Sequence, residues 1–300
     1  MKKFLTLALV AMFAFVACQK DNNKEDDKNK TPEVKTCAEN LVLHMPFEAA
    51  DNAVKVGEGF TFAEKKGAAD FGTGYIGNGY VNTKANNDEA YFKFNLAKNN
   101  ALTKLESITF TVWVKNNEEF QKGCLFSVNG RHFGTQDWPS LVTMFDNKGT
   151  EKDADGNDTG VKTQQVNGRF LFPAVAEDGS QTTVDLWLDT WNAAFAKYGT
   201  WFQYAFTYDA ATGAWALYVD GVKIKDAEFG PKNPVKECFA SDLNAFYVGG
   251  WASWIEKFNG AADWMSFFSG SIDELRIYNK ALTEAEIQAL RKEEVAIALL

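Results

Sequence analysis

One carboxylate in the sequence occupies a position where a strand is expected to face the protein core. In the segment FSGSIDELRIYNKALTEAEIQAL, residues 268–290, Leu275 and Ile277 alternate with charged residues, which is typical of a half-buried strand. The same alternation places Asp273 on the face of Leu275 and Ile277. A carboxylate among apolar side chains needs hydrogen-bond donors or a cation. Asp273 is therefore expected either to accept backbone N–H groups at a β-bulge or to help bind Ca²⁺, which takes hard oxygen ligands.

Tryptophan is the second residue type that could bind a ligand, and the chain has nine of them. Trp113, Trp201 and Trp215 fall within strand patterns and are predicted to be core residues. Indole rings in loops can stack on the C–H faces of sugars while polar neighbours bind the hydroxyls. The predicted ligand-binding residues are Trp251 and Trp254 with Asn259 and Asp263 as polar partners, followed by Trp187, Trp191, Asn192 and Trp138. The alternative is that these rings cap the ends of the fold as core residues.

No catalytic motif is apparent in the sequence. Glycosidases need two carboxylates at a set separation, whereas Asp273 and Glu274 point apart in an alternating strand. His132 has Arg131 and Asp137 nearby and could act as a base, although a lone loop histidine is more often a surface residue. Neither a nucleophile elbow nor a phosphate-binding loop is present. We therefore predict no catalytic residues.

The N-terminal residues differ in composition from the rest of the chain. Two lysines precede an apolar run from Phe4 to Val16, which is too short to span a bilayer and predicts a signal peptide over residues 1–17. The sequence FVAC is similar to a bacterial lipobox, which implies lipidation of Cys18; the alternative is an ordinary secretory signal with a chance cysteine. Residues 18–36 contain one valine and no aromatic residue, which predicts a disordered acidic tether.

The start of this tether also bears on localisation. The sequences QKD and EDD resemble the acidic signal with which some Gram-negative bacteria export lipoproteins to the cell surface. The resemblance implies a lipid-anchored protein of the outer membrane, exposed on the surface and touching the membrane through its anchor alone.

Net charge limits the classes of partner, and cysteine content limits the disulfides and zinc sites that the chain can form. The formal net charge of −9 argues against nucleic acid, whose phosphates would be repelled, and is compatible with neutral glycans or cations. Cys37, Cys124 and Cys238 remain besides Cys18, so at most one disulfide can form within the chain, and Cys124 with Cys238 is the preferred pair. Their spacing does not suggest a zinc site.

Strand patterns dominate residues 37–300, which we expect to form one domain. Asp220-Gly221 between two alternating runs predicts a tight type I′ hairpin. Pro173 places its strand near a sheet edge, because proline cannot donate to the ladder. Many short strands joined by turns predict an antiparallel sandwich or jelly roll. The expected strands lie within residues 40–47, 89–96, 107–115, 123–130, 168–175, 201–224, which holds three of them, and 245–250.

One short C-terminal helix is expected to follow the last strand. Thr283 and Glu286 have the spacing of a capping box, and Leu282 can pack against Ile287 as a hydrophobic staple. Its end is not defined by the sequence, because VAIALL, residues 295–300, could extend the helix or pack separately.

Four segments resemble motifs of the concanavalin A-like lectin/glucanase superfamily, in its laminin-G-like branch. They are YIGNGYVNT (75–83), SITFTVWVK (107–115), GTWFQYAFTYDAATGAWALYVDGVKI (199–224) and the segment 268–290, and the resemblance covers residues 40–292. It implies an all-β fold, a two-sheet antiparallel β-sandwich with ligands bound in loops or on a concave face. It also implies a structural calcium site near the closing strand, with Glu48 and Asp51 joining Asp273.

The resemblance leaves several functions open, because this superfamily contains lectins, hydrolases, lyases and protein-binding modules. The favoured prediction is non-catalytic glycan binding by a surface-anchored lipoprotein through its loop tryptophans, with further protein partners in a glycan-uptake assembly. The alternatives are a glycoside hydrolase or polysaccharide lyase with a dispersed site, and a protein-binding adhesion module.

Overall fold

The structure is a computed structural model that describes residues 32–85, 88–117, 123–130, 141–188, 198–239, 243–258, 261 and 265–300. From Glu33 to Leu300 these residues form one structural unit. Within these ranges no helix has the length and apolar character needed to cross a membrane. The predicted signal peptide, Cys18 and most of the predicted tether lie outside the described residues.

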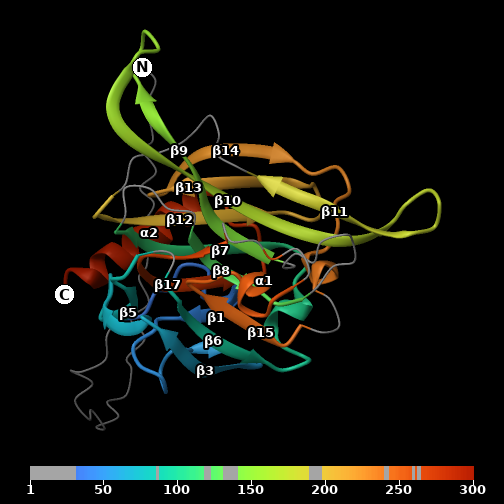
Figure 1. Cartoon of the computed structure of the whole chain (residues 1–300), viewed down its shortest axis with the longest axis horizontal. Coiled ribbons are helices and arrows are strands. Elements are labelled where there is room, and N and C mark those ends of the chain that lie inside the picture. Colours follow the sequence, from blue (N-terminus) through green and yellow to red (C-terminus); the bar gives the residue numbers. More distant parts are fainter. Residues whose placement is uncertain are drawn as a thin grey trace, which may run out of the picture. The chain divides into compact units, whose positions relative to one another are not determined.

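Two sheets pack face to face as a sandwich, which confirms the predicted fold class (Figure 1). The first sheet has the strand order β14-β13-β12-β7-β17-β1-β2, and β5 joins β4 to β17. Its strands are antiparallel, so neighbouring strands are joined by short connections or by the crossovers of a jelly roll. They are β1 (Leu41–Met45), β2 (Val56–Gly57), β4 (Asp70–Thr73), β5 (Asn78–Asn82), β7 (Ile108–Asn116), β12 (Trp201–Tyr208), β13 (Ala214–Val219), β14 (Val222–Glu228) and β17 (Gly270–Tyr278).

The second sheet has the order β11-β10-β9-β8-β15-β6-β3, with the short β16 parallel to β8. Its strands are β3 (Phe60–Gly67), β6 (Ala90–Leu96), β8 (Gly123–Val128), β9 (Leu141–Lys152), β10 (Asp158–Val175), β11 (Gln181–Leu188), β15 (Ala245–Val248) and β16 (Ser266–Phe267). The helices are α1 (Ala252–Ile255) and α2 (Glu284–Ala298), with 3₁₀ turns at Ala38–Asn40, Ala101–Lys104 and Val235–Cys238.

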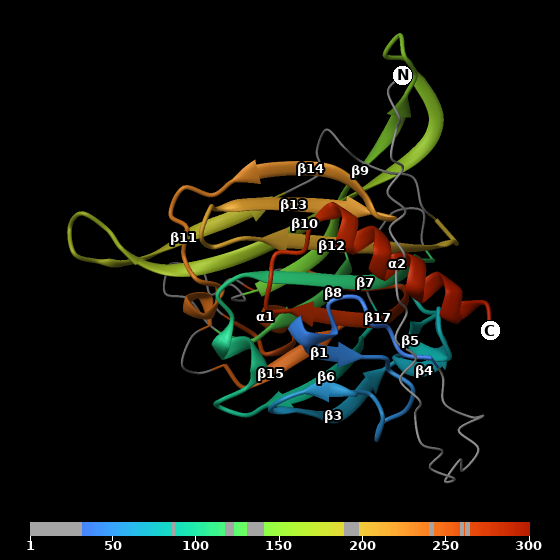
Figure 2. The ribbon, with the colours of Figure 1, turned by 180° about the vertical axis from the view of Figure 1, so that it is seen from behind.

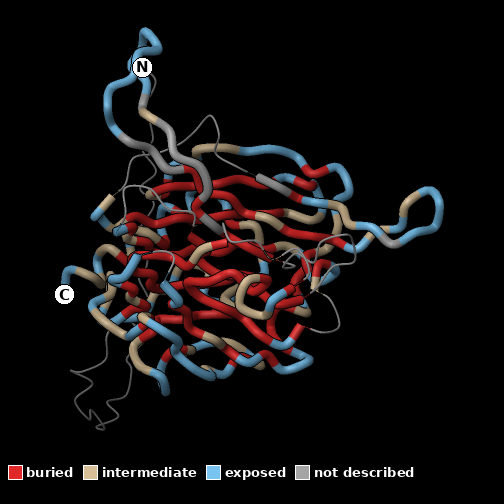
Figure 3. The backbone as a smooth tube through the Cα atoms, in the orientation of Figure 1, coloured by how far each residue is buried: buried red, intermediate tan, exposed pale blue. Residues whose placement is uncertain are grey.

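Aromatic side chains fill the space between the two sheets. In Figure 3 the buried residues lie along the central strands and the exposed ones lie at the periphery. Phe110 of the first sheet meets Phe126 of the second edge to face, with ring centroids 4.9 Å apart. Phe126 in turn stacks on Phe246 of β15 at 5.6 Å. Burial of each such ring contributes about 1.5–3 kcal/mol, so the alternating apolar residues of the two inner faces hold the sandwich together.

Local sequence signals for the turn and the helix cap are confirmed. Asp220 and Gly221 both have positive φ, 52° and 78°, as a type I′ hairpin requires. The Thr283 side chain accepts from the backbone N–H of Glu286, and the Glu286 side chain accepts from the backbone of Thr283. The helix continues to Ala298, so most of VAIALL extends it.

Pro173 lies where β10 has a single neighbour, in agreement with its predicted position near an edge. β10 pairs with β9 only as far as Phe170, opposite Leu141. Beyond that point it pairs with β11 alone, and Pro173 lies opposite Thr183. The missing N–H of the proline therefore removes no bond to β9.

The predicted side-chain direction of Asp273 is wrong, because a β-bulge interrupts β17. The register with β7 shifts between Asp273 and Arg276, and Glu274 has a positive φ of 51°. One inserted residue reverses the alternation. Ile272 and Leu275 therefore both pack in the main core, although they are three residues apart. Asp273 lies opposite Trp113 in the ladder, on the face that points away from the second sheet.

The preferred disulfide is also wrong, because Cys124 and Cys238 are both thiols and no bond joins them among the described residues. Cys124 of β8 belongs to a small cluster with Val142 and Trp251, whereas Cys238 packs in the main core. The two residues thus lie in different hydrophobic clusters, which sequence separation could not indicate.

Candidate functional site

Helix α2 packs on the outer face of the first sheet, the face that points away from the second sheet (Figure 2). Leu282, Ile287 and Leu290 form a hydrophobic cluster there with outward-facing residues of the sheet, among them Ala205 of β12. Leu282 and Ile287 share this cluster, so the predicted hydrophobic staple is confirmed. The helix therefore divides the outer face and determines which parts of it meet solvent.

A chain of four buried ionisable groups lies beneath α2. Glu294 of the helix pairs with Arg276 of β17, and the same guanidinium pairs with Glu274. The Glu274 carboxylate also contacts His44 of β1, with Oε2 2.8 Å from Nε2. Two carboxylates and one guanidinium leave one negative charge in a region shielded from water, and a proton on Glu294 or His44 neutralises it.

The pKa values of this group follow from burial. Burial raises the pKa of Glu294 to about 7, although the neighbouring Arg276 guanidinium opposes that rise. Burial and the charge of Arg276 both lower the pKa of His44 below its ordinary value. The Glu294 carboxylate also accepts hydrogen bonds from Trp113 Nε1 at 2.7 Å and Gln203 Nε2 at 2.6 Å. These contacts fix the helix to β7 and β12 as well as to β17.

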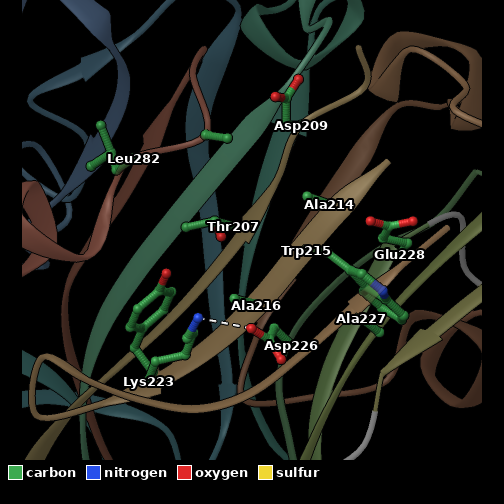
Figure 4. Close-up of a pocket in the computed structure, with 12 residues that line it drawn as sticks. Thr207, Asp209, Ala214, Trp215, Ala216, Lys223, Asp226, Ala227, Glu228 and Leu282 are labelled. Atoms are coloured by element: carbon green, nitrogen blue, oxygen red, sulfur yellow. Dashed lines mark hydrogen bonds and ion pairs between the residues drawn. The ribbon is translucent and has the colours of Figure 1, made fainter. Parts of the chain in front are cut away.

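A groove of about 530 Å³ opens on the same outer face, over β12, β13 and β14 (Figure 4). It forms because Ala216 of β13 lies between Thr207 of β12 and Asp226 of β14 in the ladder, so a methyl group stands between two longer side chains. Leu282, just before α2, lines it as well. Its volume falls within the usual range for small-molecule sites.

The groove combines carboxylates and hydroxyl groups with small apolar surfaces. Thr207, Ala216 and Tyr218 form its largely buried floor. Its remaining lining includes the charged side chains of Asp209, Lys223, Asp226 and Glu228. Lys223 Nζ donates to Asp226 Oδ2 at 2.8 Å, a contact drawn as the dashed line in Figure 4, and this bond raises the pKa of Lys223. With three carboxylates and one amine, the groove suits ligands that donate hydrogen bonds and carry no negative charge.

Only part of this groove can be recognised from the sequence. Ala216 and Tyr218 alternate with Trp215 and Leu217, and this alternation places the first two in the cluster beneath α2 and the other two in the main core. Which residues flank Ala216 depends on the register between three strands. That register brings Asp226 next to Ala216, and no local pattern in the sequence specifies it.

The prediction that Trp251 contacts a ligand is not supported by its position. Trp251 is 2% exposed and packs with Cys124, Val142 and Met265 on the second sheet. The reason is that the segment after it folds as helix α1 rather than as an open loop. Trp251 is therefore a core residue, the alternative interpretation given above.

Trp254 is the other predicted ligand-binding tryptophan whose side chain is described, and it is partly buried. The Lys257 ammonium lies 4.3 Å from the centroid of its ring, a cation–π contact. Trp187 belongs to β11, opposite Arg169 in the ladder, but its side chain is outside what the structure describes. The remaining predicted residues also lie outside the described ranges: Trp138, Trp191, Asn192, Asn259 and Asp263.

Of the three tryptophans predicted to be core residues, Trp113 and Trp215 are buried, but Trp201 is not fully buried. It is the first residue of β12, and its neighbour Phe202 takes the inward position. Trp201 therefore lies on the outer face of the first sheet with part of its ring in contact with solvent.

Asp273 is buried and accepts three backbone hydrogen bonds. Its Oδ2 accepts from the N–H groups of Tyr75 at 2.8 Å and Ile76 at 2.9 Å, and Oδ1 accepts from the N–H of Glu274 at 2.7 Å. Burial and the neighbouring Glu274 raise its pKa, while these hydrogen bonds oppose the rise. The carboxylate thus fixes the turn that contains Tyr75 and Ile76, as the bulge interpretation expects.

The predicted calcium ligands are not gathered into a cluster. In the described part of the chain, no three His, Cys, Asp or Glu side chains are placed to hold a metal ion, so Glu48, Asp51 and Asp273 do not form such a group. Glu48 Oε2 accepts from the N–H of Asn78 at 3.0 Å, and Asp51 is exposed.

Calcium binding at these residues remains a prediction. If the ion is structural, adding a chelator lowers the Tm of the protein and adding back Ca²⁺ restores it, because a ligand of the folded state stabilises that state. A thermal melt with and without chelator measures this, and an unchanged Tm would remove the calcium site.

Comparison with known proteins places the chain in a fold family. A family model described as the concanavalin A-like lectin/glucanases superfamily matches residues 86–288. No curated protein matches the sequence.

Among solved structures, the binding domain of botulinum neurotoxin serotype C1 aligns at 12% identity over 85% of this chain and 52% of that chain, with a TM-score of 0.53. A structure of botulinum neurotoxin type C, whose cell entry depends on two ganglioside molecules, aligns at 10% identity over the same shares with a TM-score of 0.50. Domain 4 of an extracellular arabinanase from Geobacillus stearothermophilus, in complex with arabinotriose, aligns at 20% identity over 84% of this chain and 98% of that chain, with a TM-score of 0.48. This chain spans about half the length of the two neurotoxin chains. The similarities to the two neurotoxin structures show the shared sandwich fold.

Proposed function

Because this chain belongs to the concanavalin A-like lectin/glucanases superfamily, we propose that it binds glycan, and that the groove over β12, β13 and β14 is a binding site. The observation that carries the proposal is the groove itself, which combines a hydroxyl-bearing floor with carboxylates around it. Neutral sugars offer many hydroxyl donors, and carboxylates are strong acceptors for them. Ala216 and Leu282 supply the apolar contacts that the C–H faces of a sugar need.

We further propose that binding occurs without cleavage of the glycan. The sequence lacks the paired carboxylates of a glycosidase, and in the groove Asp226 is already paired with Lys223. Incubation of the protein with the polysaccharide that it binds is expected to release no new reducing ends. Release that is abolished by changing one carboxylate would instead favour the hydrolase or lyase alternative.

The cellular setting is a proposal that rests on the sequence alone. The apolar run before Cys18, the lipobox-like FVAC and the polar residues 18–36 support a surface lipoprotein tethered to an outer membrane. In that setting the domain would hold glycan at the cell surface for other proteins of an uptake assembly. Labelling with radioactive palmitate, lost in Cys18→Ser, tests the anchor.

The groove predicts a preference for uncharged polysaccharides. In affinity electrophoresis, gels that contain xylan, arabinan or mixed-linkage glucan are expected to retard the protein for at least one of these, whereas polygalacturonate is expected to have no effect. The Asp226→Asn substitution removes a charged acceptor and is expected to weaken retention by about tenfold, because such a hydrogen bond contributes about 1.5 kcal/mol or more. Ala216→Trp fills the floor and is expected to abolish groove binding.

The matched control is Asp158→Asn, since Asp158 also pairs with a lysine, Lys152, on an exposed β-ribbon but lies outside the groove. It is expected to bind like the parent protein. Retention is compared between variants of equal Tm, or after correction for the fraction of each variant that is folded. Unchanged retention of both groove variants would show that the groove is not the site. If no polysaccharide retards the folded protein, the glycan proposal fails.

A further inference from the structure

An aromatic surface lies on the outer face of the first sheet, away from the groove. Tyr75 stacks on Trp113 with ring centroids 3.5 Å apart and an interplanar angle of 10°. Trp201 meets Tyr75 edge on, at 5.9 Å and 64°. Trp113 is buried, whereas Tyr75 and Trp201 are both partly exposed. We call Tyr75 and Trp201 together the aromatic shelf.

The aromatic shelf is held in place from below. Trp113, which supports Tyr75, donates its indole N–H to the buried carboxylate of Glu294. The backbone of Tyr75 donates to the buried carboxylate of Asp273. Two buried acids thus fix the partly exposed ring of Tyr75: Asp273 acts through its backbone, and Glu294 acts through its stacking partner Trp113. A ring whose position is set before a ligand arrives loses little conformational entropy on binding.

Charged side chains border the aromatic shelf. Arg291 of α2 pairs with Asp220 of the β13–β14 hairpin at 3.2 Å, and its guanidinium lies 5.6 Å from the centroid of the Trp113 ring. Both side chains remain partly exposed, 33% for Arg291 and 22% for Asp220. Burial raises the pKa of Tyr75, the charge of Arg291 opposes that rise, and the charge of Asp220 adds to it. Donors and acceptors therefore stand beside an aromatic surface.

We propose that the aromatic shelf is a second sugar-binding site, at which a neutral pyranose or furanose ring packs its C–H face on Tyr75 and Trp201. Arg291 would donate hydrogen bonds to hydroxyl oxygens of that sugar, and Asp220 would accept from its hydroxyl groups. The ligand class rests on the proposed glycan function, but the two sites are separate. Thr207 of the groove lies six residues along β12 from Trp201, about 20 Å of strand.

Asp273 is a positioning residue in this proposal, because it contacts the backbone of Tyr75 and no part of the sugar. The arrangement also gives a physical reason for a carboxylate in the closing strand. Its three backbone hydrogen bonds hold the turn that carries Tyr75 against β17.

Fluorine NMR of the full chain labelled with 5-fluorotryptophan tests the two sites separately. The resonance that disappears in Trp201→Phe is assigned to Trp201. Titration with neutral hexasaccharides, namely xylohexaose, cellohexaose and arabinohexaose, is expected to shift that resonance for at least one of them. The Tyr75→Ala substitution is expected to raise the dissociation constant measured from this shift roughly three- to tenfold, which is the effect of losing one aromatic contact.

Two further variants separate the possible outcomes. Phe71→Leu changes a partly buried aromatic residue of β4 outside the aromatic shelf and is expected to leave the Trp201 titration unchanged. Ala216→Trp fills the groove and is expected to leave it unchanged as well. If Ala216→Trp keeps both the Trp201 shift and normal polysaccharide retention, the groove is not a glycan-binding site and the aromatic shelf is supported. Retention that is lost in Ala216→Trp, without any shift at Trp201, would overturn the aromatic shelf alone, and a lack of both responses would overturn both.

Discussion

Replacing Arg276 with methionine is expected to lower the free energy of unfolding by about 3–5 kcal/mol, the usual cost of removing one partner from a buried ion pair. Arg276 is 4% exposed and lies between the carboxylates of Glu274 and Glu294. Without the guanidinium, both carboxylates stay buried near one another with no cation between them. Methionine fills much of the volume of the arginine stem, so the loss reports mainly on charge.

Urea unfolding followed by tryptophan fluorescence measures this change. The control is Lys104→Met, which removes a lysine from an exposed pair with Glu58, whose side chains are 57% and 67% exposed. That substitution is expected to change stability by at most about 1 kcal/mol. If Arg276→Met costs no more than this control, the buried chain of charges beneath α2 does not anchor the helix.

The second large effect is a dependence of stability on pH that Glu294→Gln should remove. Burial raises the pKa of Glu294 from 4.5 to about 7, so the folded protein keeps this proton in a pH range where the unfolded chain has already released it. Stability from this group is therefore fully present below pH 4.5 and falls as the pH rises through about 7. Between pH 5 and pH 7.5 the expected loss is about 2 kcal/mol.

His44 acts in the opposite direction, because its lowered pKa makes the folded state more stable as the pH rises toward 6.5. The measurement is therefore the difference between the parent protein and Glu294→Gln at several pH values. Relative to the parent protein, Glu294→Gln is expected to gain about 2 kcal/mol from pH 5 to pH 7.5.

The neighbouring Glu293 provides a matched control on the same helix. Its carboxylate accepts from the N–H groups of Lys35 and Thr36, and these bonds outweigh partial burial, so that its pKa is lowered. Stability from Glu293 is lost as the pH falls, so Glu293→Gln should show the opposite trend. A pH-independent difference for Glu294→Gln would mean that Glu294 titrates normally in the folded protein.

The local features of the fold could be predicted because short segments specify them. Asp220 and Gly221 can both adopt positive φ, so the hairpin forms between any two strands of suitable twist. Thr283 and Glu286 satisfy each other's backbone groups within a single turn of helix. Alternation over 107–115 predicted that Ile108, Phe110, Val112 and Val114 point inward along β7, and all four pack in the main core. These signals, with the family motifs, were enough for the sandwich.

The errors have one physical origin, which is that side-chain direction and burial depend on partners far away in the sequence. A single inserted residue at Glu274 turned Asp273 to the other face of the sheet, although apolar and charged residues alternate regularly in the sequence of this strand. Trp251 is covered because its segment folds onto the second sheet, while Trp201 is partly exposed because its neighbour Phe202 takes the inward place.

By itself, the sequence determined the all-β class, the position along the chain of strands such as β7 and β12, the hairpin turn and the capped helix, because each depends on contacts between near neighbours. Only the tertiary structure decided which outward-facing residues share a surface. The groove exists because β12, β13 and β14 align Thr207, Ala216 and Asp226 in a row. The aromatic shelf exists because a bulge, a helix and a turn bring Asp273, Glu294 and Tyr75 together across about 200 residues of chain, and the free energy of those long-range contacts is not encoded in any one segment.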